Sequence, residues 1–132
     1  MISISENGQK IINPTKNQVF AEISKLDGVV NSYMSLEDDR SSYIQVGGGP
    51  IEFTVEVRKM TSGEEFTHWK AEVLNMKNNG DSSIIISGSV VQVKLNQILN
   101  KNIVMLLFEA FMDGNLLPNM VGWHDMTEMF LL

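Results

Sequence analysis

The sequence predicts an α+β domain in which an antiparallel sheet of about five to six strands packs against two main helices. Residues 51–59 alternate strictly between apolar and polar side chains, as strands with one wet face do. Several short β-rich runs are separated by Gly, Asn, Asp and Ser turns. Segments near 14–26 and 95–113 carry apolar residues at helical spacing. The length of 132 residues fits one domain spanning 1–132.

The predicted strands lie close together along the chain. Ile51, Phe53, Val55 and Val57 fall on one side of the clearest strand, and acids, Thr54 and Arg58 fall on the other. Connections this short favour neighbouring antiparallel strands. An Asn-Gly pair between two short apolar runs near the N-terminus predicts a further hairpin. The other predicted strands cover residues 32–37, 43–46, 66–73 and 84–86.

Both predicted helices have recognisable ends. Asn13 is suited to cap the first helix, Pro14 to open it and Gly28 to end it. The second helix is apolar almost all round from Ile103 to Phe108, so we expect it to be the more buried of the two.

Composition excludes several classes of function. The chain has no cysteine, which rules out disulfides, thiolate zinc sites and a cysteine nucleophile. Its net charge of −6 argues against direct binding to nucleic acid. The same charge attracts a basic partner or simply keeps the protein soluble. The start of the chain lacks a signal-peptide pattern, and no apolar stretch approaches the roughly 20 residues that span a bilayer. We therefore expect a cytoplasmic protein without a membrane contact.

The candidate catalytic motifs in the sequence are better explained by structural roles. Gly47-Gly48-Gly49 precedes a proline and a strand, whereas phosphate loops lead into a helix, so it reads as a turn. His68 and His124 are the only histidines and match no zinc motif. Their convergence with an acid in a cleft would indicate an enzyme, and a wide separation would argue against one. The sequence thus predicts no catalytic residue, cofactor or metal ligand.

A set of segments occurs in a recognisable order along about residues 20–130. They are Leu26-Asp27-Gly28, Met34–Glu37, Tyr43–Pro50, Phe53–Arg58, Phe108–Phe111, Gly114, Leu117-Pro118 and Trp123-His124-Asp125. Their order resembles that in small bacterial immunity proteins of polymorphic toxin systems. The resemblance implies a non-enzymatic inhibitor that binds a cognate toxin in the bacterial cytoplasm, and it assigns no contact residues.

The leading hypothesis is therefore a protein-binding protein that neutralises a toxin, either as a monomer or as a homodimer. A toxin that attacks nucleic acid must be basic, and exposed acids would speed its association. The alternative is a small ligand-binding or regulatory module with a pocket between the sheet and the helices. From charge alone, the residues predicted to bind the partner are Glu37, Asp38, Asp39, Glu64 and Glu65.

Overall fold

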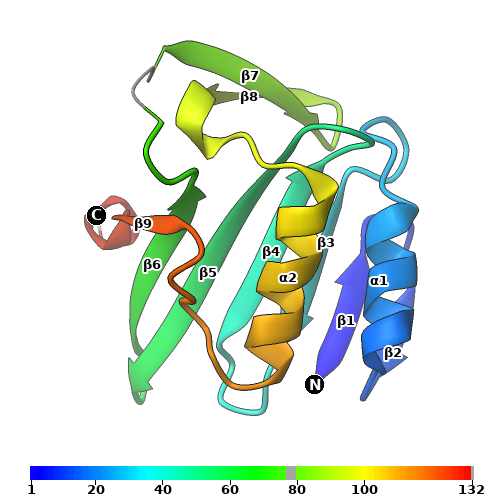
Figure 1. Cartoon of the computed structure of the whole chain (residues 1–132). Coiled ribbons are helices and arrows are strands. Elements are labelled where there is room, and N and C mark those ends of the chain that lie inside the picture. Colours follow the sequence, from blue (N-terminus) through cyan, green and yellow to red (C-terminus); the bar gives the residue numbers. More distant parts are fainter. Residues whose placement is uncertain (77–79, 132) are drawn as a thin grey trace.

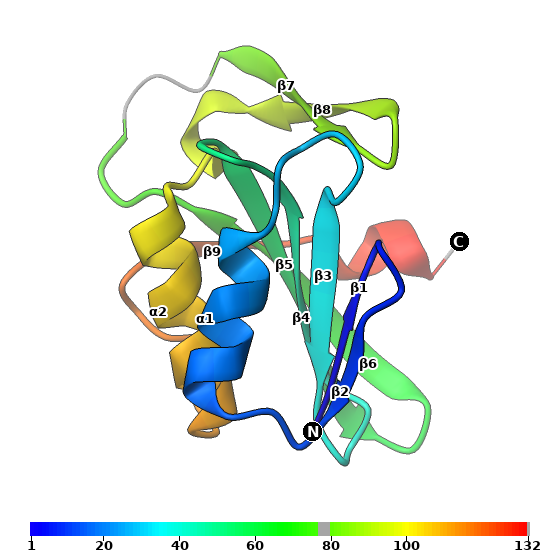
Figure 2. The same ribbon diagram turned by 90° about the vertical axis from the view of Figure 1, so that its right-hand side faces the viewer.

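A computed structural model describes residues 1–76 and 80–131 and confirms the α+β class. Two helices cover one face of a seven-stranded sheet, and a two-stranded hairpin crosses one end of it (Figures 1 and 2). The described chain contains no helix that is both long and apolar enough to cross a bilayer. In chain order the elements are β1 (Ile2–Ser5), β2 (Lys10–Ile12), α1 (Lys16–Ser24), β3 (Tyr33–Glu37), β4 (Tyr43–Gly48), β5 (Phe53–Ser62), β6 (Glu65–Glu72), β7 (Asp81–Ile86), β8 (Ser89–Lys94), the 3₁₀ turn η1 (Leu95–Gln97), α2 (Lys101–Met112), β9 (Gly122–Asp125) and the 3₁₀ turn η2 (Thr127–Phe130).

The large sheet is antiparallel throughout, with the strand order β2-β1-β3-β4-β5-β6-β9. The alternation predicted for residues 51–59 holds from Phe53 onward, where Phe53, Val55 and Val57 are fully buried. Ile51 lies before the strand and is 77% exposed, so its inclusion in the pattern was wrong. The apolar side of the sheet faces α1 and α2, which complete a continuous core with Val104, Leu107 and other buried residues.

Both helices are shorter than the sequence predicts. Thr15, rather than Asn13, caps α1, and its hydroxyl accepts a hydrogen bond from the Gln18 amide. The second helix begins only after Asn100, whose side chain accepts from the Ile103 amide. Residues 95–99 are not α-helical, because the backbone of Leu99 pairs with Phe53 in an isolated bridge. Pairing with the sheet thus overrides a helical spacing of apolar residues.

The run at 84–86 belongs to a separate sheet. It forms β7, which among the described strands pairs only with β8, a strand that the sequence patterns did not predict. The predicted five to six strands therefore become seven in the large sheet and two in the hairpin. Glu6 anchors the hairpin tip: Oε1 accepts from the amide and hydroxyl of Ser32, and Oε2 accepts from the hydroxyl of Ser87.

Candidate functional site

The sheet face opposite the helices is largely uncovered. Figure 2 shows α1 and α2 on one side of the sheet and the C-terminal turn η2 on the other. Strand register places one set of partly polar side chains on this uncovered face. Its central members are Tyr33, Ser35 and Glu37 of β3, Tyr43 and Gln45 of β4, Glu56, Arg58 and Met60 of β5, and Phe66, His68 and Lys70 of β6.

A hydrogen-bonded cluster of Glu56, His68 and Arg58 lies at the centre of the uncovered face. Arg58 and His68 stand opposite each other on β5 and β6. The Nε–H group of Arg58 donates to Nδ1 of His68 over 3.2 Å, so Nδ1 carries no proton, because a guanidinium can only donate. His68 Nε2 then donates to Oε1 of Glu56 over 2.6 Å. The two partners fix the tautomer and orientation of the ring.

Aromatic rings hold the Arg58 guanidinium in place. Its Cζ atom lies 3.9 Å from the centroid of Phe66, 4.8 Å from that of Phe130 and 5.6 Å from that of Tyr43. Phe130 comes from η2 and also packs on His68, with ring centroids 4.2 Å apart. Such cation–π contacts stabilise a charge while keeping it partly desolvated. Arg58 is therefore a rigid, half-buried cation.

Electrostatics keep the Glu56 carboxylate ionised. Burial alone would raise its pKa, but the hydrogen bond from His68 and the charges of Lys70 and Arg58 outweigh burial and hold the pKa below its ordinary value. Lys70 is nearly buried, and its Nζ atom lies 4.0 Å from Glu56 Oε2. Burial also raises the pKa of Tyr43, and there it outweighs the charge of Arg58, so the pKa lies above its ordinary value and the phenol is protonated at neutral pH.

A shallow hollow of about 420 Å³ opens beside Arg58 on this face. Its walls come from β3, β4 and β5 and from the turn between β3 and β4. The lining is mostly polar, with Met60 as its apolar member. The residues that line it are Ser35, Glu37, Ser41, Tyr43, Gln45, Arg58 and Met60.

The two histidines lie on neighbouring strands of the sheet and are not widely separated. His124 of β9 pairs with Lys70, two residues from His68 on the same strand, so both histidines share the uncovered face. Yet His68 is 2% exposed and uses both ring nitrogens internally, whereas His124 is exposed. A substrate would find no free nitrogen on His68. Within residues 1–76 and 80–131, no three His, Asp or Glu side chains form a metal-binding group.

The five predicted partner-binding acids gather at one end of the sheet. Glu37, Asp38 and Asp39 lie at the β3–β4 turn, and Glu64 and Glu65 lie at the β5–β6 turn. Both turns lie at the same end of the sheet, and the β3–β4 turn contacts β5, because the Ser42 hydroxyl accepts a hydrogen bond from the Met60 amide. We call the segments 37–42 and 59–65 the acidic end. They contain five acids and two bases, a net charge of −3, which is half of the charge of the whole chain.

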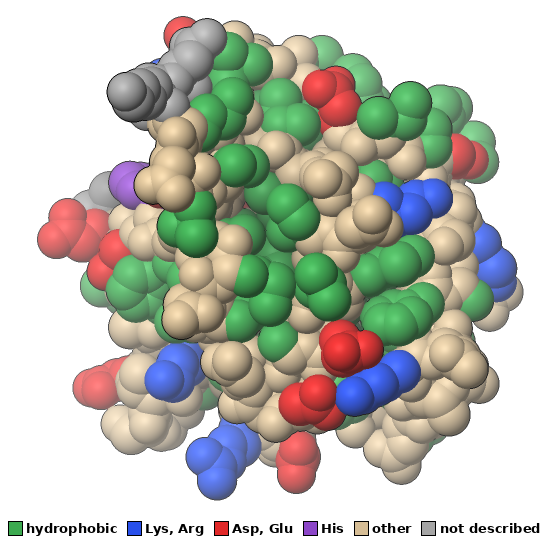
Figure 3. All heavy atoms as spheres, viewed as in Figure 1, with side chains coloured by type: hydrophobic (Ala, Val, Ile, Leu, Met, Phe, Trp, Pro, Cys, Tyr) green, Lys and Arg blue, Asp and Glu red, His purple; other side chains and the backbone are tan. Residues whose placement is uncertain are grey.

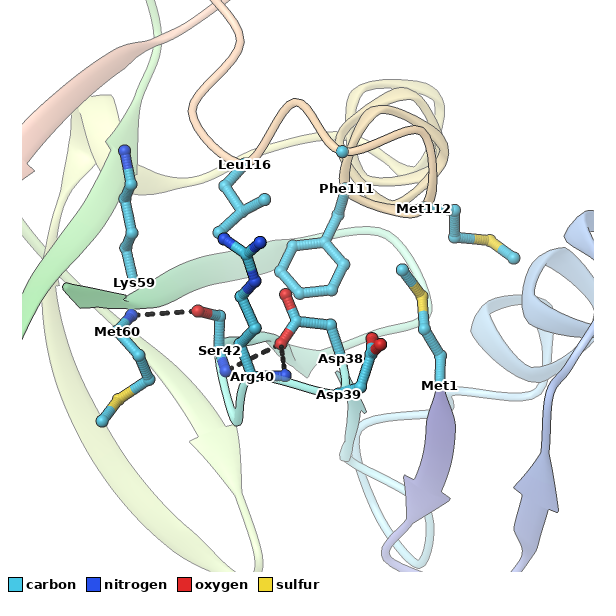
Figure 4. A pocket seen from close by; sticks show the side chains of 11 residues that line it. Met1, Asp38, Asp39, Arg40, Ser42, Lys59, Met60, Phe111, Met112 and Leu116 are labelled. Carbon is cyan, nitrogen blue, oxygen red and sulfur yellow. Dashed lines mark hydrogen bonds between the residues drawn. The ribbon is translucent and has the colours of Figure 1, made fainter. Parts of the chain in front are cut away.

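A hollow of about 350 Å³ lies between the acidic end and the C-terminal end of α2. Figure 4 shows the ring of Phe111 pointing from α2 into it. Asp39 lines this hollow, as do Arg40 and Lys59. Asp38 has a structural role, since its Oδ1 accepts from the amides of Arg40 and Ser42 and thereby closes the turn.

The helical face offers a different surface. Figure 3 shows hydrophobic side chains gathered on this side of the molecule. Phe20 of α1 and Met105 and Leu106 of α2 line an apolar hollow of about 410 Å³ there, and Leu106 is 50% exposed.

The sequence analysis identified the acids but missed the cluster around Arg58. It placed Arg58 on the wet side of its strand and His68 on the next strand, without pairing the two. The only signal was alternation on adjacent strands, which leaves the register open. The chain matches no protein-family model, and no curated protein proves similar to it.

Proposed function

We propose that this protein is a non-enzymatic binding protein that neutralises a bacterial protein toxin by covering it. The observation that carries the proposal is the acidic end, where two turns at the same end of the sheet concentrate half of the net negative charge beside a partly apolar hollow. Concentrated charge of one sign steers a partner of the opposite sign and raises its association rate. The resemblance to immunity proteins supports a toxin as that partner.

The hollow at the acidic end suits a long basic side chain. Met112 and Leu116 would contact the aliphatic stem of a lysine or arginine, and Asp39 would meet its charged head. Arg40 and Lys59 of the same lining oppose such an occupant. Glu64 and Glu65 lie exposed on the neighbouring hairpin turn, where they would add attraction at longer range. Asp38 would contribute through the shape of the turn.

The same hollow also supports the alternative of a small-ligand module. It lies at the rim between sheet and helices, and its volume of about 350 Å³ is at the lower end of the range of ligand pockets. A ligand there would contact Met60 and Met112 and would compete with a protein partner.

The test uses the product of the adjacent gene, which on this proposal encodes a large secreted protein with a toxin domain. Association rates would be measured at two salt concentrations for the wild type and for Glu64→Lys/Glu65→Lys. A matched control, Glu52→Lys/Glu128→Lys, places the same charge change on exposed acids outside the acidic end. We expect about tenfold slower association and a flatter salt dependence for the first variant only.

Asp39→Lys tests the hollow itself and should mainly raise the dissociation rate. Equal rates for the two double variants and the wild type would exclude the acidic end as the binding surface. A gene that stands alone, or within a metabolic operon, would count against a toxin partner and favour the small-ligand alternative.

A further inference from the structure

We infer that the hollow beside Arg58 on the uncovered face receives the carboxylate of an aspartate or glutamate side chain from a protein partner. This inference deepens the proposed function. It takes from that function one point, which is that the protein binds another protein. It concerns a different surface from the acidic end and a different chemistry. The acidic end would bind cationic side chains of the partner, whereas the hollow beside Arg58 would bind one anionic side chain.

The guanidinium of Arg58 supplies the charge. Its Nε–H group is used by His68, but neither Nη atom makes a hydrogen bond to any residue that the structure describes. Up to four N–H donors thus remain on a planar group that matches a carboxylate in a two-pronged geometry. The acids nearest in register, Glu56 and Glu37, make no ion pair with Arg58 among the described residues.

The rest of the lining consists largely of donors without partners. The hydroxyls of Ser35, Ser41 and Tyr43 and the side-chain amide of Gln45 make no hydrogen bond in the described part of the chain. The Tyr43 phenol is neutral at neutral pH, and burial raises its pKa further, so it can donate. One cation among several neutral donors favours an anion. Glu37 is the only acid in the lining, and it opposes such an occupant.

The rigidity of Arg58 makes the site ready for binding. Arginine side chains ordinarily lose much rotational freedom when a partner fixes them. Here three rings and His68 already fix the guanidinium, so that loss occurs on folding rather than on binding. Preordered arginines and tyrosines with free donors are the usual centres of binding energy in protein interfaces.

The surroundings favour a protein side chain over a free acid. The hollow is open on one side, so a small acid would bury little of its surface. Next to it, Ile2 pairs with Glu37 and Ile4 pairs with Ser35, which places apolar side chains on the same face. Ile4 and Ile12 are 42% and 68% exposed. A protein surface that covers these isoleucines while inserting one carboxylate would use both features.

The experiment is a titration of the full-length ¹⁵N-labelled protein followed by NMR. The probe is the peptide acetyl-Gly-Glu-Gly-amide, and its control is acetyl-Gly-Gln-Gly-amide, which differs only in charge. We expect saturable shifts of the Arg58 Nε–H and Gln45 side-chain amide signals, with binding at least about tenfold weaker for the glutamine peptide. Sodium propionate, the isolated side-chain acid, should bind more weakly than the glutamate peptide.

Variants sharpen the assignment. Arg58→Gln should weaken binding of the glutamate peptide by about tenfold or more, whereas Arg40→Gln, an exposed arginine in the neighbouring turn, should leave it unchanged. Glu37→Gln should strengthen binding about twofold by removing the opposing charge. Tyr43→Phe, which removes one hydroxyl, keeps the test valid if Arg58→Gln fails to fold, and should weaken binding a few-fold.

The glutamine peptide binding as tightly as the glutamate peptide, or Arg40→Gln weakening binding as much as Arg58→Gln, would overturn the inference. Propionate binding as tightly as the peptide would overturn it in favour of a free acid. No toxin is present in this titration, so the outcome stands apart from the proposed function. If the glutamate peptide binds at Arg58 but the protein captures no toxin, the proposed function is wrong and the carboxylate site is still supported.

Discussion

Replacing His68 with phenylalanine should lower the free energy of unfolding by about 2–3 kcal/mol. The ring is 2% exposed and connects Glu56 at 2.6 Å to Arg58 at 3.2 Å. Each hydrogen bond to a charged group contributes about 1.5–3 kcal/mol when its partner stays buried. Glu56 and Arg58 can both recover some hydration, because they are only partly buried. That recovery brings the expected loss below the sum of two full bonds.

The measurement is urea unfolding at neutral pH, followed by the fluorescence of the two tryptophans. The control is His124→Phe, the same replacement at an exposed histidine on the same face, which should change stability by less than about 0.5 kcal/mol. A double-mutant cycle of His68→Phe with Glu56→Gln should give a coupling energy of about 1–2 kcal/mol.

Equal destabilisation by His68→Phe and His124→Phe would refute the reasoning, because it would mean that the two hydrogen bonds add nothing. The coupling energy between His68 and Glu56 distinguishes two explanations for a loss of stability at His68. Consider a coupling energy near zero. It would assign any loss at His68 to packing against Phe130 rather than to its bond with Glu56.

Three further predictions concern single side chains. The folded-state pKa of Glu56 lies below its unfolded value, so its stabilisation is full above about pH 4.5 and is lost as the pH falls through the folded value. The difference in unfolding free energy between the wild type and Glu56→Gln should shrink over that acid range in a series of urea titrations. Gly28→Ala should destabilise the protein by about 3 kcal/mol, because φ at this position is +74° and the added Cβ would lie 2.2 Å from the Gly49 carbonyl oxygen. The control is Gly63→Ala, which should cost about 1 kcal/mol, because φ there is +56° but the added Cβ would meet open space. Thermal unfolding of the two variants would compare these costs. Glu6→Ala should speed hydrogen exchange in β7 and β8, because it releases the hairpin tip, and unchanged exchange there would show that other contacts hold the hairpin.

Local patterns in the sequence were sufficient to predict the buried face of a strand or helix where that face depends on the residues of the element itself. The alternation from Phe53 to Val57 and the apolar stripe of Val19 and Ile23 each state which face must be buried, and the structure buries both. The patterns failed where distant backbone intervenes. The helical spacing of Leu95 and Leu99 is real, but Leu95 lies in the 3₁₀ turn η1 and the backbone of Leu99 pairs with Phe53, so the α-helix begins only after Asn100.

The candidate sites follow the same division. The acids at 37–39 and 64–65 lie at the same end of the sheet because both segments are turns of antiparallel hairpins, and strand order alone would allow one to derive this. The arginine cluster needs the register that sets Arg58 opposite His68, and a bulge between Met60 and Ser62 interrupts the same strand pair. It also needs Phe130, which arrives from a distant part of the chain.

The position of β9 at the sheet edge has a consequence for how the chain is made. β6 must wait for residues 122–125, the last of the sheet's strands to be synthesised, before its outer edge is paired. Until then a ribosome-bound chain presents eight residues of open strand, and His68 lacks its cover of Phe130. Open strand edges are where nascent proteins pair with the wrong neighbour. Slow translation or a stall between residues 72 and 122 should therefore favour aggregation, whereas in the finished chain β9 pairs with Trp69 to Glu72 of that edge.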